Sequence, residues 1–261
     1  MSQHVYTFET GAASDRGRVR DINEDNWYAD EGCGVWLVAD GMGGHTNGKL
    51  ASFKIVESAR SVGHAASAPD LLARFTDRML RANDDLLSFS ASRNNMVLGS
   101  TLVSVLIFGN HFACVWAGDS RAYLVRGGDL HQVSRDHTEV QDLLDRGVID
   151  AEQARTWPRR NVITRAVGVF DDLELDRIHG QVLDGDRFVL CSDGLTGHVQ
   201  DAEIHDIVMK HGSQEACNRL VELTLERGAK DNVTVVIARC KMARELHHHA
   251  GPMSGSFEGA A

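Results

Sequence analysis

The decisive stretch of the sequence is Val35-Trp36-Leu37-Val38-Ala39-Asp40-Gly41-Met42-Gly43-Gly44-His45. Five apolar residues lead directly into a carboxylate and then into a glycine-rich segment. This pattern predicts a buried strand over residues 35–39 with a functional loop at its end. Burying a bare carboxylate costs free energy unless a cation or hydrogen-bond donors compensate its charge. We therefore predict that Asp40 anchors a metal site and that the other functional residues converge on it.

The composition is that of an ordinary globular protein. Of the 261 residues, 43% are hydrophobic and 25% are charged. The formal net charge of −10 disfavours nucleic acid as a partner. The apolar segment at 103–108 is too short to span a bilayer, and no secretory signal is visible, so we expect no membrane association. The five cysteines are an odd number and widely spaced, which predicts reduced thiols and a cytoplasmic location.

The hydrophobic pattern predicts the elements in chain order. Strands are expected near 5–14, 35–39, 100–108, 112–117, 121–125, 130–133, 188–191 and 233–238. Helices are expected near 49–65, 69–87, 201–211 and 213–228, with short helices within 137–160. Residues 15–26 read as a polar loop. No linker or repeat divides the chain, so we predict one α+β domain over residues 1–240 on a largely antiparallel sheet, with a disordered tail over 241–261.

Apolar strands meet an aspartate at four places. The sequences are Val38-Ala39-Asp40-Gly41, Trp116-Ala117-Gly118-Asp119, Leu190-Cys191-Ser192-Asp193 and Asp231-Asn232-Val233. A further acidic pair, Glu24-Asp25, lies in the polar loop. Aspartate and glycine are common turn formers, but the recurrence at four strands favours a shared site. Oxygen ligands alone, without nearby Cys or paired His, favour Mg²⁺ or Mn²⁺ over zinc.

Two divalent cations would balance four or five carboxylates and leave room for an anionic substrate. Such a site makes a nucleophile of a bridging water and suits displacement at phosphorus. Arg20 lies four residues before Glu24 in the same loop. It is a candidate phosphate ligand, because a guanidinium binds phosphate through two parallel hydrogen bonds.

Several motifs of the chain occur together in a known order. They are Arg20-x-x-Asn23-Glu24-Asp25, Val38-Ala39-Asp40-Gly41-Met42-Gly43-Gly44-His45, Gly99-Ser100-Thr101-Leu102, Ala117-Gly118-Asp119-Ser120-Arg121, Ser192-Asp193-Gly194-Leu195 and Asp231-Asn232-Val233-Thr234. Over about residues 8–240, the chain resembles the metal-dependent protein phosphatases of type 2C, and most of all their bacterial branch. The resemblance implies a four-layer α-β-β-α sandwich, in which two mainly antiparallel sheets are flanked by helices and a metal cleft lies at one end.

The resemblance also implies a role for each site residue. The ligands of a first metal would be Asp40, Asp193 and Asp231. Asp40 would bridge to a second metal, whose other ligands would be the Gly41 carbonyl and, through water, Glu24 or Asp25. Asp119 with Asp193 would hold a third, weaker metal. Arg20 would hold the phosphate, and residues 137–167 match a mobile flap beside the cleft.

One position departs from the animal members of the family. They carry a histidine two residues after the first metal aspartate, as the proposed acid for the leaving group. Met42 stands there in this chain, as in bacterial relatives, so another group or metal-bound water must protonate the leaving alkoxide. His45 is one candidate, although a histidine in a loop is more often structural.

We therefore predict a serine/threonine phosphoprotein phosphatase that depends on Mn²⁺ or Mg²⁺. A hydroxide activated by two tightly bound metals would attack phosphorus directly, without a phospho-enzyme. Its partners would be phosphorylated protein substrates and a cognate bacterial Ser/Thr kinase, and we expect a monomer.

Three other interpretations stay open. Residues 43–49 satisfy the G-x-x-x-x-G-K pattern of a nucleotide-binding P-loop, but Leu50 stands where that loop needs Ser or Thr for magnesium. A pseudophosphatase that binds phosphoproteins without turning them over is a second possibility, and a metal-dependent nuclease is a third. The acidic composition argues against the nuclease. His247-His248-His249 could bind stray metal in the tail.

Overall fold

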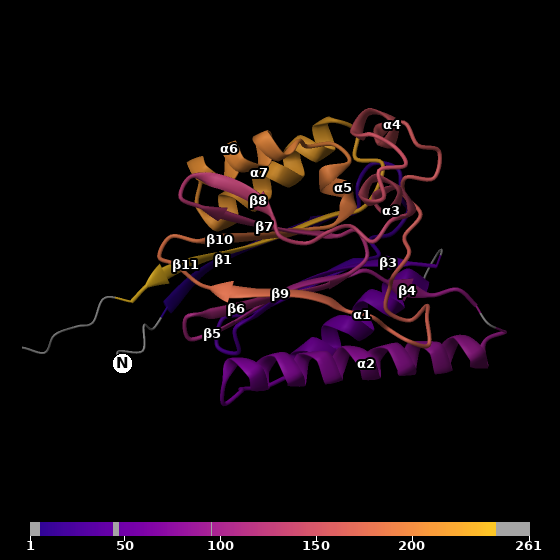
Figure 1. Ribbon diagram of the computed structural model, residues 1–261, viewed down its shortest axis with the longest axis horizontal. Coiled ribbons are helices and arrows are strands. Elements are labelled where there is room, and N and C mark those ends of the chain that lie inside the picture. Colours follow the sequence, from indigo (N-terminus) through magenta and orange to yellow (C-terminus); the bar gives the residue numbers. More distant parts are fainter. Residues whose placement is uncertain (1–5, 44–46, 95, 244–261) are drawn as a thin grey trace, which may run out of the picture.

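Two antiparallel sheets packed face to face form the centre of the computed structural model (Figure 1), which describes residues 6–43, 47–94 and 96–243. One sheet has five strands in the order β1 (Tyr6–Asp15), β11 (Val233–Met242), β10 (Arg187–Cys191), β7 (Arg121–Arg126) and β8 (Asp129–Gln132). The other runs β2 (Asp25–Asp30), β3 (Val35–Met42), β5 (Leu102–Phe108), β6 (His111–Ala117) and β9 (Asp176–Gln181), with β4 (Gly99–Ser100) paired to β3.

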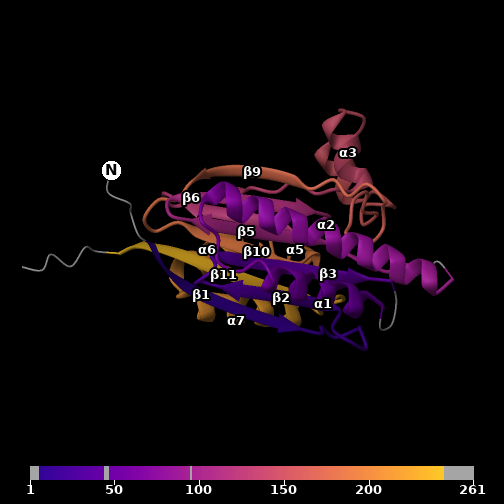
Figure 2. The same ribbon diagram turned by 90° about the horizontal axis from the view of Figure 1, so that it is seen from below.

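Helices cover the outer face of each sheet. α1 (Asn47–Arg60) and α2 (Ala68–Ser92) lie on the sheet that contains β3 (Figure 1). The other sheet is covered by α6 (Asp201–Lys210) and α7 (Ser213–Glu226), with the short α5 (Asp193–Thr196) at its end. α3 (Glu139–Asp145) and α4 (Ala151–Arg155) belong to neither layer, and α3 projects from one end of the sandwich (Figure 2). The predicted four-layer α-β-β-α sandwich is confirmed.

The uninterrupted apolar run of β3 follows from burial on both faces. Trp36 and Val38 point between the sheets, and Trp36 packs edge-on against Phe8 with ring centroids 4.8 Å apart. Val35 and Leu37 point the other way, into the layer under α1 and α2. Successive side chains of a strand alternate between its faces, so a strand covered on both sides needs apolar residues at every position.

Two strands of the structure lie where we predicted none. β2 begins within the last two residues of the expected polar loop and extends beyond it, and β9 lies in a segment without a prediction. Both are edge strands of their sheet, and Trp27, Ile178 and His179 in them are exposed. Their sequences, DNWYAD and DRIHGQ, have neither a long apolar run nor a regular alternation of apolar and polar residues, which are the two patterns that predict a strand.

The ends of the chain bear on two further expectations. β11 continues to Met242, past the predicted strand end at 238 and into the first two residues of the segment 241–261 that was predicted to be disordered. The tail histidines His247–His249 and the candidate acid His45 lie outside the described residues.

All five cysteines are unpaired, and only Cys33 is not fully buried. Among the helices that the structure describes, none combines the length and the apolar character needed to cross a bilayer.

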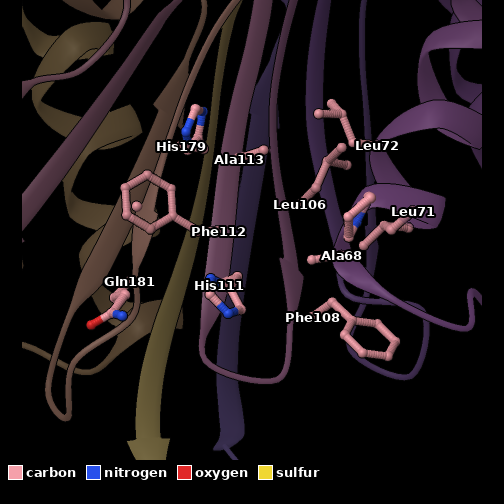
Figure 3. Close-up of a pocket in the computed structure, with 12 residues that line it drawn as sticks. Ala68, Leu71, Leu72, Leu106, Phe108, His111, Phe112, Ala113, His179 and Gln181 are labelled. Carbon is pink, nitrogen blue, oxygen red and sulfur yellow. The ribbon is translucent and has the colours of Figure 1, made fainter.

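An apolar hollow of about 560 Å³ lies between the start of α2 and the ends of β5, β6 and β9 (Figure 3). None of its described lining residues carries a carboxylate. Val35, at the start of β3, is paired with Leu106, so this hollow is at the end of the sheet away from Asp40.

Candidate metal centre

The carboxylates predicted from the sequence come together at one end of the sandwich. Antiparallel pairing of β2 with β3 places Asp25 directly opposite Asp40. Asp119 follows β6 of the same sheet, whereas Asp193 follows β10 and Asp231 precedes β11 of the other sheet. The two sheets thus contribute acidic groups to the same space from opposite sides.

A cavity of about 290 Å³ lies between these strand ends. Its lining consists of Arg20, Glu24, Asp40, Gly41, Met42, Gly43, Thr101, Asp119, Asn161, Ile163, Asp193, Asp231 and Asn232. Asp25 lies behind it, where its Oδ2 accepts a 2.8 Å hydrogen bond from Ser192 Oγ. Every residue of the predicted site is therefore in or next to one cavity.

Three buried carboxylate oxygens at this site lack a hydrogen-bond partner within the described residues. They are Glu24 Oε1, Asp25 Oδ1 and Asp193 Oδ1. A buried polar atom without a partner is unfavourable unless something else, such as an ion, satisfies it. Oxygens of ionised carboxylates are suitable ligands for hard divalent cations. The donor set therefore fits a Mg²⁺ or Mn²⁺ site.

Burial and mutual repulsion disfavour the ionised forms of these groups. Burial, and after it the charges of Asp193 and Asp231, raises the pKa of Asp25 to about 7. Burial with the nearby Asp193 raises the pKa of Asp119 to about 8. The pKa of Asp193 rises to about 6, and that of Asp40 rises well above its usual value. Divalent cations would remove this penalty, because an opposite charge favours the ionised form.

The described side chains of the site do not by themselves form a complete set of metal ligands. Among the described residues, no three His, Cys, Asp or Glu side chains are already arranged to hold one ion by themselves. Backbone carbonyls and water would have to complete the ligand set.

Gly41 is required by a close approach of backbone segments. A Cβ at this position would lie 2.1 Å from the Gly48 carbonyl oxygen and 2.7 Å from that of Glu24. The Gly41 N–H donates to the Glu24 carbonyl oxygen at 3.2 Å. The loop before β2 and the start of α1 are thereby held against the end of β3, which places Glu24 beside the cavity.

Arg20 reaches the site but is engaged by a carboxylate. Its Nη2 donates to Asp231 Oδ2 at 2.6 Å, and the pair is well exposed, with side-chain exposures of 52% and 38%. The pKa of the Arg20 guanidinium is raised, mainly by this hydrogen bond. An exposed ion pair is weak, so a phosphate can compete for the guanidinium at little cost.

Three polar residues that hold the site together were not assigned a role from the sequence. Asn232 Oδ1 accepts the Glu24 N–H at 2.8 Å, and its Nδ2 donates to the carbonyls of Arg16 and Ile22. Thr101 Oγ1 accepts the Asp40 N–H at 3.0 Å. Ser192 Oγ accepts the Thr234 N–H at 3.0 Å besides bonding Asp25. All three lie in the motifs quoted above, and this position is the sequence signal that could have identified them.

His137 was missed as well. Its Nδ1 accepts the Gly118 N–H at 3.2 Å, and its Nε2 lies 3.0 Å from Asp176 Oδ2. This assigns the Nε2–H tautomer, with the ring holding the backbone next to Asp119. The segment after His137 also reaches the cavity, since Asn161 and Ile163 line it.

The P-loop interpretation is wrong. All strand pairs of the described sheets are antiparallel, whereas a P-loop follows a strand of a parallel βαβ unit. Asp40 and Asp193, moreover, face one cavity from two different sheets.

Known proteins resemble this chain over most of its length. The family model described as "Protein phosphatase 2C" matches residues 23–143. The serine/threonine protein phosphatase PstP of Mycobacterium tuberculosis is 38% identical over 91% of this chain, and the match covers 46% of PstP, so the chain spans about half of that relative's length. Serine/threonine phosphatase stp of Listeria welshimeri is 32% identical, with 86% of this chain and 92% of stp covered.

Solved structures show the same fold. PppA of Pseudomonas aeruginosa, described as a key regulatory component of T6SS, superposes with a TM-score of 0.84 at 40% identity, over 89% of this chain and 97% of that one. The catalytic domain of PstP in complex with two manganese ions superposes with a TM-score of 0.83 at 35% identity, over 91% of this chain and all of that one. The chain therefore belongs to the protein phosphatase 2C family.

Proposed function

We propose that this protein is a serine/threonine phosphoprotein phosphatase that depends on Mn²⁺ or Mg²⁺. The observation that carries the proposal is the convergence of acidic groups from both sheets on one cavity, with buried oxygens that lack partners among the described residues. The family, and the two manganese ions bound by PstP, support two tightly held ions here.

The ligand assignment is part of the proposal. Asp40, Asp193 and Asp231 would hold the first ion. Asp40, the Gly41 carbonyl and, through water, Glu24 or Asp25 would hold the second. Asp119 with Asp193 would hold a third, weaker ion. The position of all these groups in or behind one cavity supports the assignment.

Each part of the site has its own task in the reaction. The bound ions supply Lewis acidity toward a phosphate ester and activate water at neutral pH. Arg20 exchanges its contact with Asp231 for the substrate phosphate and orients it by paired hydrogen bonds. Thr101 and Asn232 fix the backbone at Asp40 and Glu24, so that these groups need not reorganise. Met42 lines the cavity and has no proton to donate.

We further propose that residues 1–240, together with the last two residues of β11, form a single catalytic domain with a flap over 137–167. The enzyme would act as a monomer in the cytoplasm, opposite a bacterial Ser/Thr kinase. Five unpaired cysteines are consistent with a reducing compartment. The related bacterial Ser/Thr phosphatases support phosphorylated proteins as substrates.

Metal-dependent hydrolysis tests the proposal. Metal-stripped protein is assayed with p-nitrophenyl phosphate and with a phosphothreonine peptide, after addition of Mn²⁺, Mg²⁺ or ATP-Mg. We expect phosphate release from both substrates only with Mn²⁺ or Mg²⁺. The variant Asp129→Asn, which changes an exposed aspartate in the β7–β8 hairpin, serves as the control and should behave like the wild type. Tight binding of the phosphopeptide without turnover would instead indicate a pseudophosphatase.

A further inference from the structure

A second hollow, of about 620 Å³, adjoins the carboxylate cavity. The two share the lining residues Asp119, Asn161, Asp193 and Asp231. Residues of α3, of α4 and of the turn after α4 line one side of the second hollow, and Gly194 and residues 196–198 line the other. Figure 1 shows α3, α4 and α5 at the same end of the molecule. A polypeptide whose phosphorylated residue occupies the carboxylate cavity, of about 290 Å³, extends well beyond that cavity. The second hollow is the space next to it.

Three exposed cations line this second hollow. Arg155 ends α4, Arg160 lies in the following turn, and Lys230 immediately precedes Asp231. In the described part of the chain, none of these three side chains forms an ion pair or a hydrogen bond. Their neighbours differ in this respect, since Arg159 pairs with Glu139 at 3.0 Å and Arg121 with Asp136 at 2.7 Å.

The three unpaired cations are opposite in sign to the net charge of the protein. The protein carries a formal net charge of −10, and four aspartates also line this hollow: Asp119, Asp136, Asp193 and Asp231. Asp136 is paired with Arg121, and the other three are the proposed metal ligands, so bound cations would neutralise them. Within the described residues, Arg155, Arg160 and Lys230 are then the charges of the hollow that no opposite charge balances. Cations placed around one concave surface concentrate positive potential there and attract anionic groups. The rest of the wall includes the polar side chains of Thr138, Gln141 and Asn161, which can donate hydrogen bonds to a bound peptide.

We propose that Arg155, Arg160 and Lys230 form a subsite for anionic side chains next to the phosphorylated residue of the substrate. The preferred substrates are then acidic phosphopeptide segments, which deepens the proposed phosphatase function and rests on it. The anion is a carboxylate or a second phosphate, because a guanidinium binds either one. Exposed ion pairs are individually weak and screened by salt, so the preference must be moderate and fall with ionic strength.

The test compares phosphothreonine peptides that differ only in the residues flanking phosphothreonine. One set has glutamate on the N-terminal or the C-terminal side, and matched sets have glutamine, lysine or a second phosphothreonine there. The value of kcat/KM is measured with Mn²⁺ at about 50 mM and about 300 mM salt, a range over which exposed charges become strongly screened. Each peptide is assayed with the wild type, the double variant Arg155→Gln/Arg160→Gln and the variant Arg146→Gln.

Arg146→Gln is the matched control. Arg146 is an exposed arginine of the same segment, but it does not line the hollow. The preference is a ratio between two peptides on the same enzyme, so any general loss of activity in a variant cancels.

We expect the wild type to favour the glutamate peptide over the lysine peptide about tenfold at low salt, which corresponds to about 1.4 kcal/mol. The double variant should lose most of this preference, while Arg146→Gln keeps it. The phosphothreonine-flanked peptide shows whether a second phosphate serves as well as a carboxylate. Equal kcat/KM values for the glutamate and lysine peptides, or a preference that the double variant retains, would overturn the inference.

Failure of the phosphatase proposal would look different. In that case neither p-nitrophenyl phosphate nor any peptide is hydrolysed with Mn²⁺ or Mg²⁺. Fluorescence anisotropy with labelled peptides then decides the subsite separately. Tighter binding of the glutamate peptide that is lost in the double variant supports it, and equal binding of both peptides rejects it.

Discussion

Replacing Asp25 by asparagine should stabilise the metal-free protein while damaging the site. Asp25 is only 9% exposed, and one of its oxygens has no hydrogen-bond partner among the described residues. Its pKa is raised from 3.8 to about 7, first by burial and then by neighbouring carboxylates. Asparagine has nearly the same shape, keeps an oxygen to accept from Ser192 and carries no charge.

The magnitude follows from the linkage between pKa and stability. Because the pKa is raised, the folded state binds more protons than the unfolded state between about pH 4 and pH 7, and the free energy of unfolding falls as pH rises through this window. The rise of the Asp25 pKa from 3.8 to about 7 gives a penalty of roughly 4 kcal/mol above pH 7, at about 1.36 kcal/mol for each pKa unit. The penalty is roughly 2 kcal/mol at pH 5 and largely gone by about pH 3. Asp25→Asn removes it.

Urea unfolding monitored by circular dichroism, in EDTA at pH 5 and pH 8, measures the effect. The free energy of unfolding of Asp25→Asn should exceed that of the wild type by several kcal/mol at pH 8 and by clearly less at pH 5. Added Mn²⁺ should stabilise the wild type more than the variant, because a cation offsets the same penalty. Asp84→Asn, at an exposed position of α2, is the control and should show neither effect. A gain that is equal at both pH values, or none at pH 8, would refute the reasoning.

Four further substitutions test the proposed roles at the metal centre. Asp40→Asn and Asp193→Asn should each reduce Mn²⁺-dependent hydrolysis of p-nitrophenyl phosphate to background, and a near-normal rate in either purified variant would contradict the ligand assignment. Asp119→Asn should retain two tightly bound Mn²⁺ ions in calorimetry yet turn over more slowly, so unchanged kinetics would speak against a third ion. Arg20→Ala should raise KM for a phosphopeptide by about tenfold or more with a smaller change in kcat, because it removes a substrate contact; an unaltered KM would exclude Arg20 from the phosphate site.

The chemistry of the candidate site could be predicted because short local motifs contain the residues that carry it. Asp40 and Asp193 each follow an apolar run, and Asp231 precedes one, so strand ends and carboxylates are visible together in the sequence. The buried strands were predictable for the same reason, since a strand covered on both faces is apolar throughout. The edge strands β2 and β9 were not, because their sequences have neither a long apolar run nor a regular alternation of apolar and polar residues.

The donor types, their order along the chain and the buried strands that carry them can be recognised in the sequence. Which donors meet depends on the packing of one sheet against the other, and this is visible only in the folded molecule. Asp25 contacts Ser192, and Glu24 contacts Asn232, across 167 and 208 residues. The hollow lined by Arg155 and Arg160 arises in the same way, from α4 and its turn standing opposite the segment after Asp193. Contacts between distant segments follow from burial of the whole core, which no local pattern encodes.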